Sequence, residues 1–259
     1  MATVTDSEPW VRAVRASHDR LSGIVAGLDA DGLRTRSRAK EWTIADVLSH
    51  LGSGAEIFLL SLNAGVTGAE PPTQADFQPI WATWNARSPQ EQAAQCLVAN
   101  ETLVSRVESL TAAEREAFSV VMFGAMTMDL AGLLGLRLSE HAIHTWDVAA
   151  ALDPSATVAP DAVALLIDTI GPLAARTGKP DGKQRRLHVA TTGPERHFVL
   201  ETSDAVSLTE AASEPGAPDL RLPAESLVRL IYGRLDPAHT PVAADSAGLD
   251  DLRGLFPGF

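Results

Sequence analysis

Apolar side chains recur every three or four positions over most of the first two thirds of the chain, which is the period of amphipathic helices. The first such stretch has Pro9 in its opening turn and an apolar stripe from Trp10 to Leu28. The second begins with Thr43 and has an acid, Asp46, three residues later, the pattern of a capping box. This periodicity predicts helices over residues 6–28, 43–62, 88–110, 125–152 and 160–176, with a short helical piece after Thr111.

The pattern changes near residue 180, where apolar and polar residues begin to alternate. The stretch RRLHVATTGPERHFVLE, residues 185–201, alternates around a Thr-Gly-Pro turn and predicts a β-hairpin. DAVSLTEA and PDLRLP predict two further short strands, and AESLVRLIYGRL predicts a short amphipathic helix. We therefore expect an α+β protein with an α-helical bundle over residues 1–179 and a small α+β domain over residues 180–259.

One apolar run, AFSVVMFGAMTMDLAGLLGL at residues 117–136, is long enough to cross a bilayer. Asp129 and three glycines interrupt it, and two charged residues follow closely, so we expect a buried core helix entered from a short loop. The first residues, MATVTDSEPWVRAV, lack the basic start and apolar run of a secretory signal. These features predict a cytoplasmic protein with no membrane partner.

The composition narrows the classes of partner and of chemistry. Hydrophobic residues make up 45% and charged residues 21%, as in a globular protein with a substantial core. The formal net charge of -12 comes with no basic stripe, so we expect no nucleic-acid partner. The single cysteine, Cys96, excludes a disulfide framework and a cysteine-based zinc cluster, and its helical surroundings predict an ordinary buried thiol.

The stretch SEHAIHTWD concentrates ionisable groups on the helix predicted over 125–152. At about 100° per residue, His144 lies about 40° from Glu140 and Asp147 about 20° on its other side. Glu140 and His144 therefore point from the apolar stripe towards the bundle core, whereas His141 lies about 100° away, at the edge of the stripe. A buried acid and histidine at this spacing present two ligand atoms to one point, or they form a hydrogen-bonded pair.

A third ligand is available on the helix predicted over 43–62. His50 flanks its apolar stripe and is able to face the interior, and two histidines with one carboxylate form a known open site for zinc or iron. The other histidines look different. His18 lies outside the stripe of its helix and is expected to be exposed, and the remaining ones lie in the predicted hairpin or in a proline-flanked loop.

Together these motifs resemble the mycothiol-dependent maleylpyruvate isomerase family. The resemblance rests on EWTIADVLSHL, on Glu140-x-x-x-His144 with HTWDVAAAL, and on PDLRLPAESLVRLIYGRL, and it covers nearly the whole chain. It implies a DinB-like, up-down, metal-binding four-helix bundle followed by a small α/β domain similar to sterol carrier proteins. Abundant alanine and an excess of arginine over lysine indicate a GC-rich bacterial genome, as in actinobacteria.

The resemblance also implies roles for individual residues. His50, Glu140 and His144 would be the metal ligands, with zinc, nickel or iron as the cation. Arg234 would match the family's C-terminal arginine that faces the metal cleft; the alternative is an exposed arginine at a helix end. Asp147 is placed to orient a ligating histidine, and Trp42 is expected to pack around the site.

The chain supplies no Gly-x-Ser-x-Gly elbow, Walker motif or Rossmann fingerprint, so the nucleophile is expected to come from outside. By the resemblance, this is a zinc-dependent and mycothiol-dependent isomerase or thiol transferase. Its partners would be a small thiol and a small electrophilic substrate, with Arg234 holding a substrate carboxylate. A metal-dependent hydrolase and a non-enzymatic ligand-binding protein remain alternatives, and both a monomer and a homodimer stay open.

Overall fold

The computed structural model of the chain describes residues 6–122, 124, 126–212, 217–241 and 248–258. It divides into two compact units, Met1–Ala156 and Thr157–Phe259. The presence of a helical unit followed by a mixed unit confirms the predicted α+β class.

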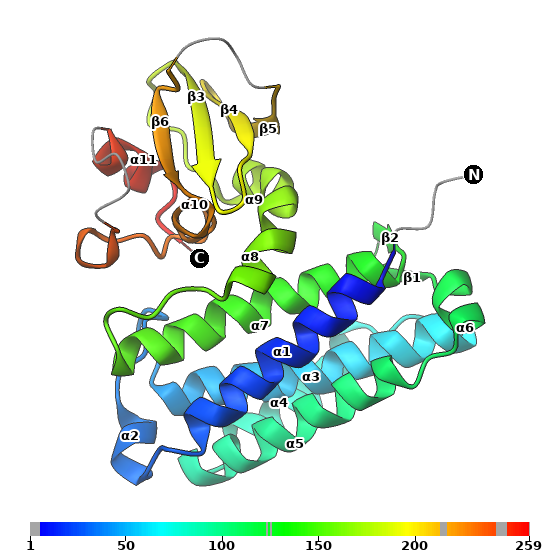
Figure 1. Cartoon of the computed structure of the whole chain (residues 1–259). Helices are drawn as coiled ribbons and strands as arrows, with labels where there is room; N and C mark the ends of the chain where they lie inside the picture. The colour runs from blue at the N-terminus through cyan, green and yellow to red at the C-terminus, as the bar shows by residue number, and fades with distance from the viewer. Residues whose placement is uncertain (1–5, 123, 125, 213–216, 242–247, 259) are drawn as a thin grey trace. The chain divides into compact units, whose positions relative to one another are not determined.

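Four long helices build the first unit (Figure 1). Both α1 and α3 pack mainly against α5 and α7, so the four helices enclose one core. This arrangement confirms the predicted helical bundle. In chain order the elements of the unit are α1 (Glu8–Val25), α2 (Ala30–Arg34), α3 (Ile44–Thr67), α4 (Gln74–Asn85), α5 (Pro89–Glu108), α6 (Ala112–Ala117), β1 (Val120–Met122), β2 (Met126–Met128) and α7 (Leu130–Leu152).

Short polar motifs set where the helices begin. Thr43 and Asp46 form the expected capping box at the start of α3, and the same reciprocal pattern of Ser or Thr with an acid three residues later starts α5 and α6. A further box at Thr73 and Asp76 starts α4, a helix that the periodicity did not predict. The helix predicted over residues 43–62 continues to Thr67, and α4 begins at Gln74 and tolerates Pro79 inside it.

The apolar run at residues 117–136 leads into a buried core helix, as expected, but strands rather than a loop precede that helix, and it begins later than predicted. The first half of the run forms an antiparallel pair of strands, β1 and β2, and α7 begins only at Leu130, after Asp129 accepts a hydrogen bond from the backbone N–H of Gly132 at 2.8 Å. Residue 125, the expected helix start, lies outside the described residues. Within the described parts of the chain, no helix combines the length and apolarity that crossing a bilayer requires.

The second unit is a small sheet covered by helices. Its strands lie in the order β5-β4-β3-β6, with β6 parallel to β3 and the other neighbours antiparallel, and the β3–β4 pair is the predicted hairpin. In chain order the elements are α8 (Pro160–Leu166), η1 (Ile167–Thr169), α9 (Ile170–Thr177), β3 (Arg185–Thr192), β4 (His197–Thr202), β5 (Val206–Glu210), β6 (Leu220–Pro223), α10 (Ala224–Ile231), η2 (Pro237–His239) and α11 (Leu249–Leu255).

The division between the units falls earlier than the expected boundary near residue 180. The segment α8–α9 was expected to belong to the bundle, but α9 packs on β5, and both α8 and α9 contact α10. Its apolar side chains Leu166, Ile167 and Ile170 are almost fully buried in these contacts. Helical periodicity predicts that such a face is covered, but not which element covers it.

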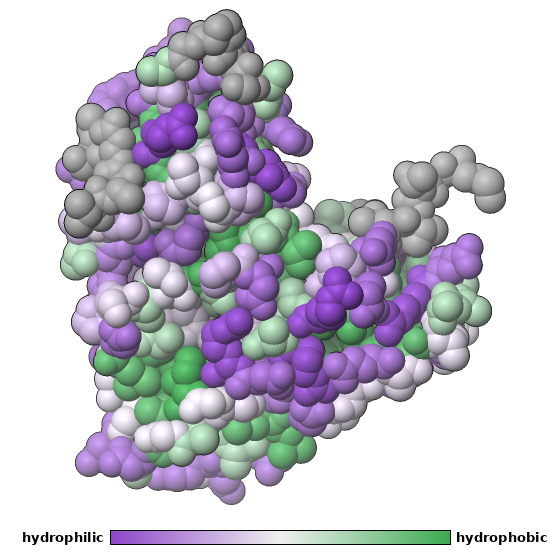
Figure 2. All heavy atoms as spheres, viewed as in Figure 1, coloured by the Kyte–Doolittle hydropathy of each residue, from purple (hydrophilic) through white to green (hydrophobic). Residues whose placement is uncertain are grey.

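The core of the first unit lies between its long helices. Leu21 of α1, Leu48 and Leu51 of α3 and Cys96 of α5 are all fully buried there. Hydrophilic residues gather on the opposite, outward side of α1 (Figure 2). This separation of apolar and polar faces is the expected outcome of the amphipathic pattern in the sequence.

A close contact between α3 and α4 gives a test of this packing. A Cβ atom added at Gly52 would lie 2.0 Å from Cη2 of Trp84, a side chain that is 1% exposed and donates its indole N–H to Glu56. Because this buried, hydrogen-bonded ring would have to shift, we expect Gly52→Ala to lower the free energy of unfolding by about 3 kcal/mol. Urea denaturation followed by tryptophan fluorescence measures this change.

Gly23→Ala is the matched control, because Gly23 is exposed on α1 and nothing lies within 4 Å of its added Cβ. Alanine is the better helix former, so this control should raise the free energy of unfolding by about 0.5–1 kcal/mol. Equal stabilities of the two variants would show that α4 does not pack on Gly52 as described.

Candidate metal centre

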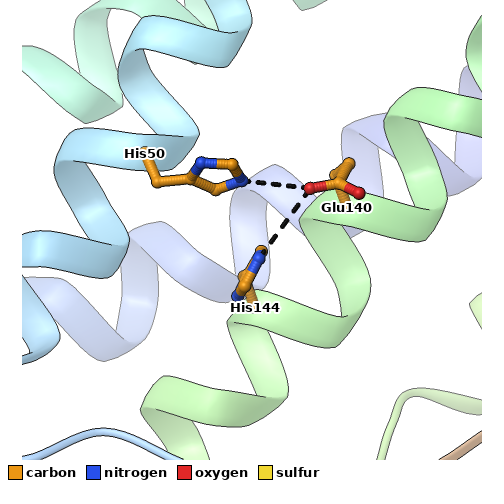
Figure 3. A group of neighbouring side chains, drawn as sticks. All are labelled: His50, Glu140 and His144. Atoms are coloured by element: carbon orange, nitrogen blue, oxygen red, sulfur yellow. Dashed lines mark hydrogen bonds and ion pairs between the residues drawn. The ribbon is translucent and has the colours of Figure 1, made fainter. Parts of the chain in front are cut away.

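The three predicted ligands come from facing helices. His50 lies two turns into α3, whose first turn is fixed by the capping box, and Glu140 and His144 lie one turn apart on α7. The structure brings them together: Nε2 of His50 lies 3.0 Å and Nε2 of His144 lies 3.8 Å from Oε2 of Glu140 (Figure 3). Asp46, by contrast, serves as the helix-cap acid, as expected.

The donor set fits a divalent cation. One ligand atom from each of His50, Glu140 and His144 lies within 4.8 Å of the others, so one ion is able to contact all three. The side chains of His50 and Glu140 are 37% and 43% exposed, and that of His144 is 13% exposed. A ligand from solvent therefore has access to the same point, which is typical of reactive rather than purely structural metal sites.

Glu140 is held as a carboxylate. Burial raises its pKa, but the hydrogen bond with His50 and the positive charges of His144, His50 and Arg137 outweigh burial and bring the pKa to about 2. An ionised oxygen donor between two imidazoles is the charge state that a zinc-type ligand set requires.

Asp147 orients His144 through a hydrogen bond to the ring nitrogen that does not face Glu140. Nδ1 of His144 lies 2.9 Å from Oδ2 of Asp147, whose side chain is 0% exposed. A carboxylate can only accept this hydrogen bond, so Nδ1 carries the proton, and Nε2 is the nitrogen that the neutral ring would offer to a metal. The expected role of Asp147 as the partner of a ligating histidine fits this geometry.

Trp42 covers the two histidines. Its ring centroid lies 5.2 Å from that of His50 and 5.8 Å from that of His144, and it stacks on His144 at an interplanar angle of 25°. The indole thus limits the rotation of both imidazoles. This is the packing role expected of Trp42.

Two other histidines differ from their predictions. His141 was placed at the edge of the stripe but is 1% exposed, with Nδ1 2.8 Å from Oγ of Ser17, and burial lowers its pKa well below the usual value. His18 was expected to be exposed but is 5% exposed and lies 3.1 Å from Glu101. Both errors have one cause: α1 packs against α5 as well as α7, and α7 against α1 as well as α3, so the buried face of each is wider than its apolar stripe.

The remaining candidates lie apart from the ligand set. Cys96 is fully buried, as expected, and burial raises the pKa of its thiol to about 12. Arg234 lies in the second unit, where its Nη1 donates to the backbone oxygen of Tyr232 at 3.1 Å. Its role in holding a substrate carboxylate stays a prediction.

Sequence reasoning overlooked Arg137. Its guanidinium is 2% exposed and lies three residues before Glu140 on the same face of α7. The available signal was a charged residue inside an apolar stripe, one turn from a candidate ligand.

A helical bundle that gathers two histidines and a glutamate from facing helices belongs to the class of bundle proteins that build metal sites between their helices. Comparison with known families refines this class. The family model described as the Mycothiol maleylpyruvate isomerase N-terminal domain matches residues 14–149, and the chain belongs to this family. The matched range contains His50, Glu140 and His144.

Two solved structures share the fold over most of the chain. A crystal structure of the mycothiol-dependent maleylpyruvate isomerase covers 95% of this chain and 99% of its own, with a TM-score of 0.66 at 16% identity. A mutant of that enzyme covers 90% of this chain and 92% of its own, with a TM-score of 0.65 at 17% identity. At these identities the likeness establishes the fold, including a C-terminal domain after the bundle.

A curated relative shares a shorter region. A protein of Geobacillus thermodenitrificans (strain NG80-2) named "Putative metal-dependent hydrolase" is 34% identical over 84 residues, which are 32% of this chain. The chain spans about half of that relative's length, 47%.

Replacing Asp147, the buried carboxylate that hydrogen-bonds His144, tests whether His144 is a metal ligand. We expect Asp147→Asn to weaken zinc affinity by about 10–100-fold, because the amide no longer fixes the tautomer of His144. Competition with a fluorescent zinc chelator measures the affinity. The control is Asp153→Asn at the exposed end of the same helix, which should leave it unchanged. Equal affinities for the two variants would mean that Asp147 does not support a ligand.

Proposed function

We propose that the chain is a metal-dependent enzyme that uses mycothiol to isomerise a small electrophilic substrate or to transfer the thiol to it. The observation that carries this proposal is the convergence of His50, Glu140 and His144 within 4.8 Å, with access from solvent. Membership in the mycothiol maleylpyruvate isomerase family supports the thiol and the reaction type.

His50, Glu140 and His144 would hold zinc or another divalent metal. When bound, such a cation lowers the pKa of a coordinated thiol, so that the thiolate is present at neutral pH. An external thiol is needed because Cys96, the chain's single cysteine, is buried and has its pKa raised to about 12. The chain therefore binds and orients its nucleophile rather than supplying it.

The reaction follows from addition to a conjugated double bond. The thiolate sulfur forms a bond to one alkene carbon, and the electron pair moves onto the conjugated carbonyl oxygen. The former double bond is then single and rotates, and reversal expels the same thiolate and leaves the isomerised alkene. If the adduct instead takes a proton on carbon and is released, the outcome is thiol transfer. Arg234 would hold a carboxylate of the substrate.

A metal-dependent hydrolase is the second candidate. The observation that favours it is the name of the Geobacillus relative, which is 34% identical over 84 residues. In a hydrolase the thiol would have no role, and water would be the nucleophile.

Turnover with and without thiol separates the two functions. The zinc-loaded protein is assayed with maleylpyruvate in buffer that contains mycothiol and, as the control, in buffer without thiol. A second assay tests whether the same protein cleaves a panel of activated esters and amides. The proposal expects conversion only when mycothiol is present. Thiol-independent cleavage of an ester or amide, with no thiol-dependent isomerisation or adduct formation, would contradict it.

A further inference from the structure

The short hairpin formed by β1 and β2 gathers most of the methionine of the chain. Three of the four methionines, Met122, Met126 and Met128, lie within seven positions, and the fourth is Met1. Met122 belongs to β1, and Met126 and Met128 belong to β2, just before the start of α7 (Figure 1). Neither the metal centre nor the proposed reaction uses these residues.

The strand register places the three thioethers on one face of the hairpin. Met122 is the direct cross-strand partner of Met126, and such partners point to the same side of an antiparallel pair, with Cβ atoms about 4.5–5.5 Å apart. Met126 and Met128 lie two residues apart on β2, so they also share a face. Thr127 and its partner Val121 point to the other side. Met126 therefore has a methionine neighbour both across the hairpin and along its own strand.

The face that carries the thioethers is buried at one end and accessible at the other. Met122 is 7% exposed, whereas Met126 is 43% exposed. Strand β1 packs on α3 and β2 packs on α7, where Cβ and Cγ of Met128 lie 3.4 and 3.7 Å from the place that a Cβ atom on Gly132 would occupy. A small ion from solvent thus has access at Met126 and has partly buried methionines beside it.

Thioethers favour a particular class of ligand. The sulfur of methionine is a neutral, polarizable donor that suits a soft cation such as Cu(I), whereas carboxylate and carbonyl oxygens suit magnesium or calcium. Methionine also has three rotatable bonds, so side chains that share a face are able to close around one ion. Packing alone accounts for the buried Met122, but it does not require a thioether at the exposed Met126.

We propose that Met122, Met126 and Met128 form a binding site for Cu(I) on the β1–β2 hairpin. This site is separate from the metal centre. Helix α7 begins at Leu130 and reaches Glu140 ten residues later, which is about 15 Å along the helix. The donors also differ, because the metal centre offers two imidazoles and a carboxylate, and the hairpin offers only sulfur.

Cys96 carries the other side-chain sulfur within the described part of the chain and is the natural competitor for a soft cation. It is fully buried, and burial raises the pKa of its thiol to about 12. The thiolate rather than the thiol is the metal ligand. We therefore expect a soft cation to bind at the hairpin and not at Cys96.

Spectra of the methionine methyl groups test the site. Ag(I), the air-stable analogue of Cu(I), is titrated in chloride-free buffer into the zinc-loaded full chain, whose methionine methyl groups carry carbon-13. We expect three of the four methionine signals to shift together and to saturate at one ion per chain. Competition with a chromophoric chelator under reducing conditions then measures the affinity for Cu(I).

Conservative variants separate the role of sulfur from that of packing. Leucine has nearly the volume of methionine, so Met126→Leu and Met128→Leu should keep the fold. Each should weaken Cu(I) binding by about tenfold or more, because a direct ligand is worth at least as much as an outer-shell partner. The matched control combines Met126→Leu with Thr127→Met, which restores the number of thioethers but places one on the other face. Its affinity should stay as low as that of Met126→Leu.

The contrary results are equally specific. No change in the methyl spectrum, or a shift of the Met126 signal alone, would show that the three thioethers do not form one site. Cu(I) affinities of the folded Met126→Leu and Met128→Leu variants within about twofold of wild type would exclude these residues as ligands. Recovery of wild-type affinity in the control with Thr127→Met would mean that the number of methionines, rather than their shared face, decides binding.

Discussion

Replacing His50 with alanine is expected to lower zinc affinity by more than about 100-fold. Outer-shell partners of metal ligands are typically worth 10–100-fold, and a direct ligand contributes more. The loss is large because three protein groups converge here among the residues that the structure describes. Nε2 of His50 lies 3.0 Å from Glu140, within a set whose ligand atoms fall within 4.8 Å of one another. Elemental analysis after dialysis against a weak chelator measures the retained zinc.

His197→Ala is the matched control for this experiment. It removes an imidazole from the hairpin of the second unit, where His197 lies 3.5 Å from Glu195, and should leave one zinc per chain. Stoichiometric zinc in His50→Ala, or equal loss in both variants, would rule out the assignment of His50 as a ligand.

Removing the cation is expected to abolish turnover and to destabilise the first unit selectively. A ligand present at 1,000 times its dissociation constant stabilises the folded state by about 4 kcal/mol, and a chelator removes that contribution. All five tryptophans lie in the first unit, so tryptophan fluorescence reports on its unfolding alone. The fluorescence melt of wild type should therefore shift to lower temperature when the chelator is added.

The His50→Ala variant supplies the reference for that shift. Because it should already lack the cation, its fluorescence melt and its residual activity should not respond to the chelator. A wild-type melt and turnover rate that are both insensitive to chelation would contradict a metal centre in this unit.

Local geometry explains why the sequence could predict that these three candidate ligands lie close together. Glu140 and His144 share a helix face whatever the tertiary packing, and the capping box at Thr43 sets where α3 begins, so helical phase alone indicates that His50 is able to face inward. The family resemblance then linked His50 with Glu140, which lie 90 positions apart in sequence and 3.0 Å apart between Nε2 and Oε2 in the structure.

The errors arise where tertiary contacts decide. An apolar stripe reports one buried face, but α7 is covered by both α1 and α3, and so His141 and Arg137 are buried although polar. The hairpin before α7 was missed because residues 117–136 are mostly apolar, and such a run does not by itself distinguish a strand from a helix. The expected unit boundary was late because α9 covers β5, a partner that periodicity does not identify.

Thiol binding, measured on a sample of known metal content, is the most direct test of the proposed metal and thiol site. Mycothiol is titrated calorimetrically into wild-type protein with a measured content of one zinc per chain, and into the same preparation after the metal has been stripped. We expect saturable binding of one thiol per chain to the loaded protein, with proton release, and loss of that binding in the stripped protein. Equal thiol affinity in both forms, or no binding to either, would contradict a thiol site built on His50, Glu140 and His144.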